Sequence, residues 1–345
     1  MPDETLAGAP PAGAREAVER EYAALRSAAI LVDRSARARA TFSGPKSAEV
    51  LTGLFTNDVL ALTPGDGQYA AALTAKGKVL ADLRIFATGD GFLVDLPPRA
   101  APGWWTMIRK YVNPRLSKYA DVSETLRDVG VFGVGARALA AQAIGMSADI
   151  LGALAPYAHR PIPSAGEGAL VARVPDLGLE GFELLAPPDA AAALWQALRA
   201  AGATPAGHDT FDVARIEAGR PEWGLDIDDT TLAQEANLHE LGAISYTKGC
   251  YTGQETVARV HFRGHVNRHL RGIQFPGSDL PSMGSALRDA EGRVVGEVRS
   301  TAWSPRLGGI ALAMIRREVE PGGIITAAWD DAHTSAVVIG LPFPL

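Results

Sequence analysis

Two kinds of hydrophobic pattern follow one another along this chain, and they predict its helices and strands. Apolar residues recur at helical spacing between residues 15 and 26, which predicts an amphipathic helix. Short apolar runs, several with two-residue alternation, predict strands at 37–42, 68–74, 79–86 and 91–96. The residues Ala75-Lys76-Gly77-Lys78 separate two of these runs and are typical of a β-hairpin turn. The first third of the chain is therefore expected to be an α+β unit.

The same order of elements is expected a second time between residues 128 and 205. There, strands at 169–174 and 181–186 precede a helix at 189–202. A further helix at 211–218 is expected to end at Gly219, with Pro221 beyond it. After Arg268 the pattern changes to short strands broken by glycines, at 270–275, 294–300, 309–314 and 324–329. Such regular spacing without helices predicts a small β-barrel.

Length and composition narrow the class of protein. A chain of 345 residues is too long for one comfortable core, so two or three domains are expected. Apolar residues make up 47% and charged residues 21%, as in ordinary globular proteins. The net charge of −6 opposes contact with a phosphate backbone, and we expect no direct nucleic-acid binding.

The N-terminus and the cysteine content suggest a compartment. Residues 1–14 are rich in Ala, Pro and Gly and lack the features of a signal peptide, so a disordered tail is expected. No run approaches eighteen apolar residues, so no membrane-spanning helix and no membrane partner are expected. A single cysteine excludes an internal disulfide and fits a reducing compartment. The expected location is the cytoplasm.

The most informative stretch is the octet Lys248-Gly249-Cys250-Tyr251-Thr252-Gly253-Gln254-Glu255, which contains the only cysteine. Thr252 and Glu255 have the spacing of a capping box, which predicts a helix start just after Cys250. The helix dipole and Lys248 would then both favour the thiolate form of Cys250. The alternative is a small buried structural thiol beside two turn glycines, and the local sequence leaves both open.

Two further patterns suggest ligands. Gly133, Gly135 and Ala138 satisfy a dinucleotide-binding fingerprint, but the chain shows no βαβ alternation around it, so we do not expect a nucleotide there. His261, His265 and His269 recur every four residues, and on one helix they would bind a metal together with Cys250.

The sequence around these histidines argues against a metal site. Gly264 indicates a loop, and the arginines between the histidines, Arg259 among them, would repel a cation. We expect no metal, and instead a basic lip that attracts an anionic ligand or an acidic partner.

The octet and two other stretches carry a family resemblance. Together with Arg215-Ile216-Glu217-Ala218-Gly219-Arg220-Pro221 and Gln234-Glu235-Ala236-Asn237-Leu238, it resembles the YgfZ family, the folate-binding relatives of the glycine-cleavage T-protein. The resemblance is dense from about 211 to 271 and looser elsewhere. It implies an α+β, three-domain cloverleaf of the T-protein type, with a C-terminal small β-barrel, around a central cavity that receives tetrahydrofolate.

This architecture gives expected domain boundaries. After the tail, residues 15–127 and 206–268 would form a discontinuous folate-binding domain, residues 128–205 a second α+β domain, and residues 269–345 the barrel.

The resemblance also implies roles for four residues. Glu183, in the stretch Gly181-Phe182-Glu183, matches a glutamate that binds the pterin ring, and a carboxylate suits the adjacent pterin N–H donors. Arg215 matches an arginine for the anionic glutamyl tail, and Trp223 an aromatic residue against the cofactor. Asp95 lies near the place of the T-protein aspartate that acts on the folate nitrogen. The surrounding pattern is absent, so Asp95 is expected only to contact the cofactor.

The resemblance further implies a function in the assembly or repair of iron–sulfur clusters of the [4Fe–4S] type, with iron–sulfur carrier or client proteins as partners. Cys250 would be the reactive group and Lys248 would keep it ionised. Gln254 and Glu255 would fix the loop, and Arg259 would attract an anion.

Two other hypotheses stay open. One is a folate-dependent one-carbon transferase, similar to an aminomethyltransferase or demethylase, that acts on an amine. The other is a folate-sensing adaptor without covalent chemistry. Whether the protein is an enzyme is not decided by the sequence.

Overall fold

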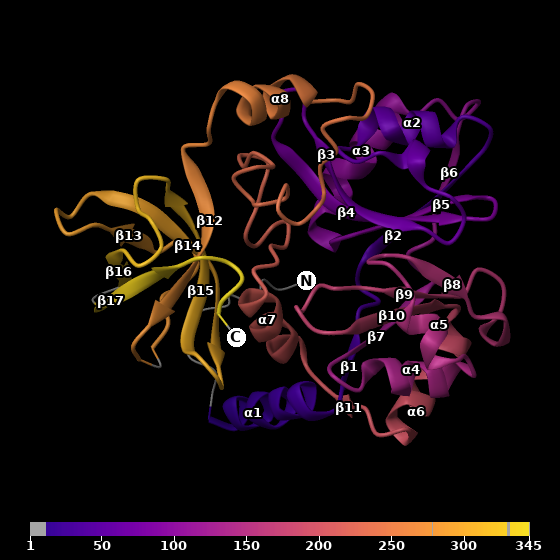
Figure 1. The fold of residues 1–345 in the computed structure, drawn as a ribbon, viewed down its shortest axis with the longest axis horizontal. Coiled ribbons are helices and arrows are strands. Elements are labelled where there is room, and N and C mark those ends of the chain that lie inside the picture. Colours follow the sequence, from indigo (N-terminus) through magenta and orange to yellow (C-terminus); the bar gives the residue numbers. More distant parts are fainter. Residues whose placement is uncertain (1–11, 278, 330–331, 345) are drawn as a thin grey trace.

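The computed structural model of this chain describes residues 12–277, 279–329 and 332–344. Three lobes surround helix α7 (His208–Glu217), which lies at the centre of Figure 1. The first helix, α1 (Ala12–Ser27), begins three residues earlier than the sequence pattern predicts, so residues 12–14 are helical rather than part of a tail. The rest of the expected disordered tail, residues 1–11, lies outside the described residues. Among the helices of the described ranges, none combines the length and apolar character needed to cross a bilayer.

The first lobe is an antiparallel sheet with strand order β3-β4-β5-β2-β6. Its strands are β2 (Ala38–Ser43), β3 (Gly67–Leu73), β4 (Val79–Thr88), β5 (Gly91–Leu96) and β6 (Lys118–Asp121). Its helices are α2 (Ser47–Leu54), α3 (Ala101–Tyr111) and the short 3₁₀ segments η1 (Val59–Ala61) and η2 (Pro98–Ala100). The predicted hairpin is confirmed as β3–β4. One face of the sheet packs against α2 and α3 around buried Phe42, Leu83 and Trp104.

The second lobe is a six-stranded sheet with the order β11-β1-β7-β10-β9-β8. Its strands are β1 (Ile30–Asp33), β7 (Arg127–Phe132), β8 (His159–Pro161), β9 (Leu170–Arg173), β10 (Gly181–Ala186) and β11 (Thr204–Pro205). Its helices are α4 (Ala136–Ile144), α5 (Ala148–Gly152), the 3₁₀ segment η3 (Pro163–Ala165) and α6 (Pro188–Ala200). They form a second core with the sheet.

Two features of this sheet bear on the sequence-based predictions. Strand β1 pairs with β7 and β11, so its apolar residues, buried on both faces, belong to the second sheet although they precede the first one in sequence. The fingerprint at Gly133 follows β7, which is antiparallel to both of its neighbours. A dinucleotide site needs a parallel βαβ unit, so this stretch is not one.

The third lobe confirms the predicted barrel. It is closed, with the order β12-β15-β14-β13-β16-β17. Its strands are β12 (Arg268–Phe275), β13 (Ala286–Arg288), β14 (Val294–Ser304), β15 (Gly308–Arg316), β16 (Ile324–Trp329) and β17 (Ala332–Ile339). The sequence pattern missed β13, which is only three residues long, and β17, whose outward residues are polar.

Between the lobes runs a segment from Ala218 to Gly253 that contains no helix or longer strand. It leads from α7 to α8 (Gln254–Arg263), which lies at the top of Figure 1 and joins the first lobe to the barrel. Helix α7 is almost wholly buried, with its last turn packed against the barrel strands β14 and β15. The centre of the molecule is thus lined by residues from all three lobes.

Candidate functional site

A narrow cavity of about 30 Å³ lies where the two sheets meet α7. Strands β3 and β4 contribute Tyr69, Asp82 and Arg84 to its wall. The connection from β1 to β2 contributes Arg34 and Arg37. Other parts of the wall are Asp176, Phe211, Arg215, Arg220 and Glu222. A cavity of this volume holds roughly one water molecule.

The charges reach the cavity because of the two-residue period of a strand. Asp82 and Arg84 are two positions apart on β4, in a strand that is otherwise apolar, so both point to the same face. That face is buried against the second lobe, and the two side chains are 5% and 2% exposed. Buried charges need partners, which is why carboxylates and guanidinium groups gather here.

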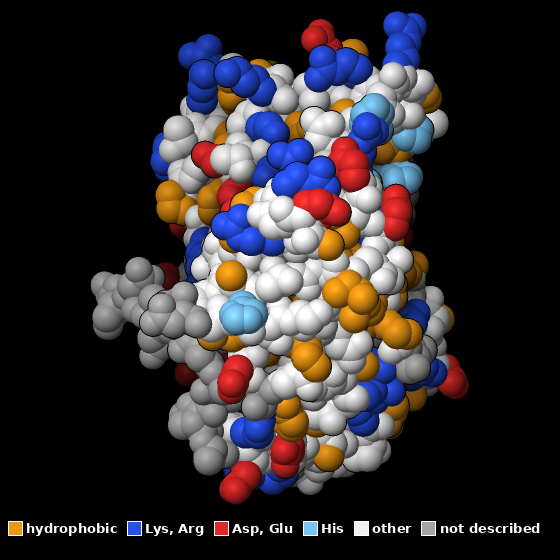
Figure 2. Space-filling view, turned by 90° about the vertical axis from the view of Figure 1, so that its left-hand side faces the viewer, with side chains coloured by type: hydrophobic (Ala, Val, Ile, Leu, Met, Phe, Trp, Pro, Cys, Tyr) orange, Lys and Arg blue, Asp and Glu red, His pale blue; other side chains and the backbone are white. Residues whose placement is uncertain are grey.

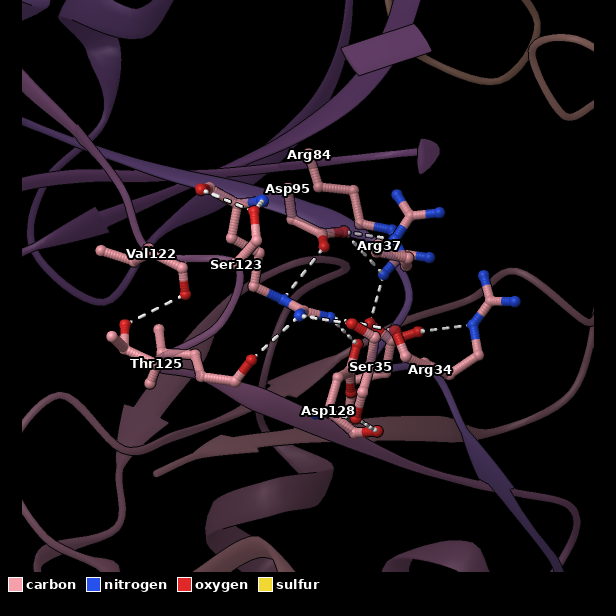
Figure 3. A network of polar contacts seen from close by, with 12 residues as sticks. Arg34, Ser35, Arg37, Arg84, Asp95, Val122, Ser123, Thr125 and Asp128 are labelled. Carbon is pink, nitrogen blue, oxygen red and sulfur yellow. Dashed lines mark hydrogen bonds and ion pairs between the residues drawn. The ribbon is translucent and has the colours of Figure 1, made fainter. Parts of the chain in front are cut away.

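Asp95 forms the centre of an ion-pair network next to the cavity (Figure 3). Its carboxylate lies 2.6 Å from Arg37, 3.4 Å from Arg39 and 3.5 Å from Arg84. Burial alone would raise the pKa of Asp95, but Arg37 and the other two arginines outweigh it and hold this pKa below its usual value. A carboxylate held ionised by three cations is a poor proton carrier.

Asp82 differs from the other buried carboxylates of the wall. It accepts hydrogen bonds from the Tyr69 hydroxyl at 3.0 Å and from the backbone N–H of Trp223 at 3.2 Å. Among the described residues, no cation lies within ion-pair distance of it. Burial raises its pKa, and the more distant charge of Arg37 only partly opposes this. Asp82 is therefore the wall group best suited to carry a proton.

Asp176 and Glu183 hold Arg84 between them. Arg84 donates to both carboxylates, and Asp176 also lies 2.9 Å from Arg220. Burial would raise the pKa of Asp176, but Arg84 and Arg220 hold it far below its usual value. The second oxygen of Glu183, Oε1, is buried without a hydrogen-bond partner among the described residues, 3.8 Å from Arg34 Nε. This oxygen is an unused acceptor beside Arg34 and Arg84, two residues that line the cavity.

Two of the residues expected to bind the cofactor are occupied by the protein itself. Arg215 lies in the cavity wall, yet its donors bind Asp212 at 2.5 Å, Asp226 at 2.7 Å and Ser300 at 2.8 Å. The indole of Trp223 donates to the Val79 carbonyl at 3.0 Å. Arg215 thus cross-links α7 to the barrel, and the Trp223 indole is bonded to β4. The contact of Trp223 with Asp82 comes from its backbone N–H.

The octet forms an exposed loop before α8. Cys250 is a free and exposed cysteine, which excludes the buried structural thiol. The predicted capping box is wrong: helix α8 begins at Gln254, its N-cap is Gly253, and no side chain caps it. Gly253 has a φ of 83°, and a Cβ there would lie 2.6 Å from the Thr74 carbonyl oxygen, so this close approach to the β3–β4 turn fixes where the helix starts.

Lys248 and Gln254 fasten this loop. The ammonium of Lys248 donates to the carbonyls of Thr52 and Phe55, at the C-terminal end of α2. The side chain of Gln254 accepts from the backbone N–H of Tyr251 at 3.0 Å. Lys248 therefore directs its donors to helix α2. Glu255 and Arg259 are exposed on α8.

Helix α8 presents a basic surface, as the sequence suggested. Figure 2 shows Lys, Arg and His side chains gathered at the upper end of the molecule, where Figure 1 places α8. His261 stacks on Tyr246, with ring centroids 3.7 Å apart, and His265 and His269 lie beyond the helix end. Within the described residues no group of His, Cys, Asp or Glu side chains is arranged to hold a metal.

The sequence-based reasoning missed Asp82, Tyr69 and Arg84, which form much of the cavity wall. A usable signal was present. Two charged residues on one face of an otherwise apolar strand indicate a buried polar site rather than a solvent-facing surface. The pair Arg37 and Arg39, at the start of β2, carries the same signal.

Comparisons with known proteins agree on one family. Residues 8–245 match the GCVT N-terminal domain, and residues 268–343 match the glycine cleavage T-protein C-terminal barrel domain. The aminomethyltransferase of Synechococcus elongatus (strain ATCC 33912) is 31% identical over 303 residues, which cover 86% of this chain and 79% of that protein. The aminomethyltransferase of Nostoc sp. (strain PCC 7120) is 28% identical over 307 residues, covering 86% and 80%.

A solved structure has the same fold. The glycine cleavage system aminomethyltransferase T from Bartonella henselae aligns with a TM-score of 0.85 over 95% of this chain and 89% of that one, at 22% identity. The predicted T-protein architecture with its closed C-terminal barrel is therefore confirmed.

Proposed function

The chain belongs to the glycine cleavage T-protein family, and from this premise we propose that it binds tetrahydrofolate in the central cavity and performs folate-dependent one-carbon transfer. Aminomethyltransferases of this family use tetrahydrofolate. The observation that carries the proposal is Asp82, a buried carboxylate with a raised pKa and no ion-pair partner among the described residues, in the wall of the cavity.

The donors and acceptors around the cavity fit a folate. Glu183 Oε1 is a buried acceptor without a partner among the described residues, and it suits a pterin N–H. The cavity is smaller than a pterin ring, so binding requires a side chain to move. Arg34 is free to do so, because its terminal nitrogens form no hydrogen bond within the described parts of the chain, and its guanidinium lies 3.9 Å from the centre of the Phe211 ring.

Asp82 would carry the proton that one-carbon transfer requires. Tetrahydrofolate, when bound, would supply the nitrogen atoms that exchange the one-carbon unit with an amine. Tyr69 and the backbone of Trp223 hold the Asp82 carboxylate in one orientation. Because burial raises its pKa, Asp82 exchanges protons closer to neutral pH than an exposed aspartate does, which favours general acid–base catalysis.

The variant Asp82→Asn tests this role, since it keeps the shape and removes the titrating group. Tetrahydrofolate binding is measured by calorimetry. Folate-dependent transfer is measured with a panel of aminomethyl donors, whose carbon is already at the formaldehyde oxidation level, so that its transfer to tetrahydrofolate releases the amine and needs no oxidant. Turnover is expected to fall by about 10²–10⁴-fold, the usual contribution of a general acid or base. The matched control is Asp90→Asn, at an exposed turn. A wild-type chain that does not bind tetrahydrofolate would refute the proposal, and unchanged turnover in Asp82→Asn would remove Asp82 from it.

The octet supports a second candidate function, membership of the YgfZ branch of this family with a role in [4Fe–4S] cluster assembly or repair. The specific observation is an exposed free thiol, Cys250, in a loop that Lys248 fastens to the first lobe and that Gln254 braces through the backbone N–H of Tyr251. Such a thiol is accessible to a cluster iron or to a carrier protein. In this function Arg259 and the basic surface of α8 would attract an acidic carrier or a polyglutamyl folate.

One cellular experiment separates the two functions. Cells that lack the gene would carry the wild-type chain, Cys250→Ser or Asp82→Asn, and the activity of a [4Fe–4S] enzyme would be measured. Cluster support through the thiol predicts rescue by Asp82→Asn and failure of Cys250→Ser. If cluster support instead depends on folate-dependent transfer, Cys250→Ser should restore the enzyme activity and Asp82→Asn should not. Absence of rescue by the wild-type chain would remove the iron–sulfur function.

A further inference from the structure

The buried arginines around the cavity fall into two groups. Arg39, Arg84 and Arg215 each bind at least one carboxylate closely and use further nitrogens on other acceptors or a second carboxylate. Arg220 binds both Asp176 and the Tyr157 hydroxyl through one terminal nitrogen. The positive charge of these four arginines is neutralised inside the protein. The terminal nitrogens of Arg34 and Arg37, in contrast, have no acceptor among the described residues.

Arg34 is 7% exposed, and among the described residues the one carboxylate within ion-pair distance is that of Glu183. It lies 3.8 Å from Nε, which is too far for a hydrogen bond. Its terminal nitrogens donate to no acceptor among the described residues. Figure 3 shows its guanidinium directed away from the Asp95 network, with no contact drawn from its end. The side chain lies in the wall of the cavity, over the face of Phe211.

Arg37 is also 7% exposed and lines the same cavity. It donates through Nε to Asp95 at 2.6 Å, and its two terminal nitrogens have no acceptor in the described part of the structure. Asp95 is shared with Arg39 and Arg84, so it supplies one negative charge to three cations.

The two guanidinium groups influence each other. Burial lowers the pKa of Arg34, and the like charge of Arg37 lowers it further. Two neighbouring buried cations with unused N–H groups raise the free energy of the empty protein, and an anion between them lowers it. A planar carboxylate suits such a site, because a guanidinium binds its two oxygens through parallel hydrogen bonds.

We propose that Arg34 and Arg37 form a carboxylate-binding subsite in the wall of the central cavity. Arg215, the arginine that the family resemblance assigns to an anion, has its donors occupied. Arg34 and Arg37 instead bring to the cavity wall terminal nitrogens that have no acceptor among the described residues. Resting on the proposed folate function, the carboxylate comes either from the glutamyl group of the folate or from a separate small substrate bound beside it.

The test uses three probes on the full chain: tetrahydrofolate, 6-methyltetrahydropterin, which lacks the glutamyl group, and glutarate, a dicarboxylate without a ring. Binding is measured by calorimetry for the wild type, Arg34→Gln and Arg293→Gln. Arg293 is an exposed arginine of the barrel and serves as the matched control for loss of one positive charge. Thermal unfolding is followed with and without glutarate.

Glutarate is expected to raise the unfolding temperature of the wild type and of Arg293→Gln, and to leave that of Arg34→Gln unchanged. If the folate tail is the occupant, Arg34→Gln binds tetrahydrofolate at least about tenfold more weakly, as expected for loss of a charge-assisted hydrogen bond, and binds the tail-less pterin normally. If a separate carboxylate is the occupant, Arg34→Gln binds both pterins normally, and glutarate binds the wild type together with tetrahydrofolate.

A second readout needs no variant. Phenylglyoxal modifies buried arginines when side-chain motion exposes them, and mass spectrometry locates the positions modified in the ligand-free protein. Glutarate is expected to protect Arg34 and Arg37 of the wild type and to leave Arg293 reactive. Equal glutarate stabilisation of wild type and Arg34→Gln, or absence of protection at Arg34 and Arg37, overturns the subsite. A wild type that binds glutarate through Arg34 but no tetrahydrofolate refutes the folate function and leaves the subsite standing.

Discussion

Lys248 and Phe55 are separated by 193 positions in the chain, yet the ammonium of Lys248 donates to the Phe55 carbonyl oxygen at 2.6 Å. The same ammonium donates to the Thr52 carbonyl. These two carbonyls end helix α2, where backbone acceptors lack intrahelical donors and a positive charge is favoured. Lys248 thus caps α2 and ties the loop of Cys250 to the first lobe.

Replacing Lys248 by Met is expected to lower the free energy of unfolding by about 1–3 kcal/mol, because two partly buried carbonyls lose their donor. Denaturant unfolding measures this. Lys76→Met, at the exposed tip of the β3–β4 hairpin, is the control and should change the stability little. Equal effects of the two substitutions would show that the contacts of Lys248 contribute nothing to stability.

Gly253→Ala is expected to disturb the start of α8. The new Cβ would meet the Thr74 carbonyl oxygen at 2.6 Å and would sit at a φ of 83°, so the stability should fall by about 1–3 kcal/mol. The control is Gly249→Ala in the same loop, where no atom lies within 4 Å of a new Cβ. Unfolding curves of both variants, with the accessibility of Cys250 to a thiol reagent, provide the measurement. A Gly253→Ala chain as stable as Gly249→Ala would argue against this packing.

Asp176→Asn is expected to cost about 3–5 kcal/mol, because it leaves the buried charges of Arg84 and Arg220 without a shared carboxylate. The arginines hold the pKa of Asp176 below that of the unfolded chain, so its stabilisation is present above the ordinary aspartate pKa and is lost as the pH falls. The variant should therefore lose less stability than the wild type on acidification. Asp90→Asn is the exposed control, and a cost below about 1 kcal/mol would contradict the network.

His159 predicts a second pH effect. Burial lowers its pKa to about 4, from an ordinary value of 6.5, and the nearby charge of Arg160 adds to this. Between these two pH values the unfolded chain binds the proton and the folded chain does not, so stability falls as the pH falls from 6.5 to 4.

The stability lost in this way at His159 approaches about 3 kcal/mol at pH 4. His159→Gln should remove that part of the pH dependence, as measured by unfolding at pH 7 and pH 4. The control His208→Gln, at an exposed histidine, should keep the pH dependence of the wild type. A variant whose acid sensitivity matches the wild type would show that His159 is not the responsible group.

Local patterns in the sequence were sufficient for most of the elements. The hairpin β3–β4, strand β5, helices α6 and α7 and the glycine-broken strands of the barrel all lie within a few residues of their predicted places. Their periodicity depends only on neighbouring residues that share a face. The octet likewise predicted a loop before a helix, although the N-cap is Gly253 rather than Thr252, because Gly253 packs against Thr74.

The sequence by itself determined the wider T-protein family, the order of the elements and the presence of one distinctive cysteine loop. Tertiary structure decided which charged groups meet: Arg84 binds Glu183 across 99 positions, Arg220 binds Asp176 across 44, and Lys248 binds α2 rather than its own loop. It also made Asp82 a buried group without an ion-pair partner among the described residues, and left Arg34 and Arg37 with unused donors at the cavity. The reason is physical. A period of two or 3.6 residues is set along the chain, whereas the partner of a buried charge is set by how distant segments pack, because each charge removed from water needs a counterpart within a few ångströms.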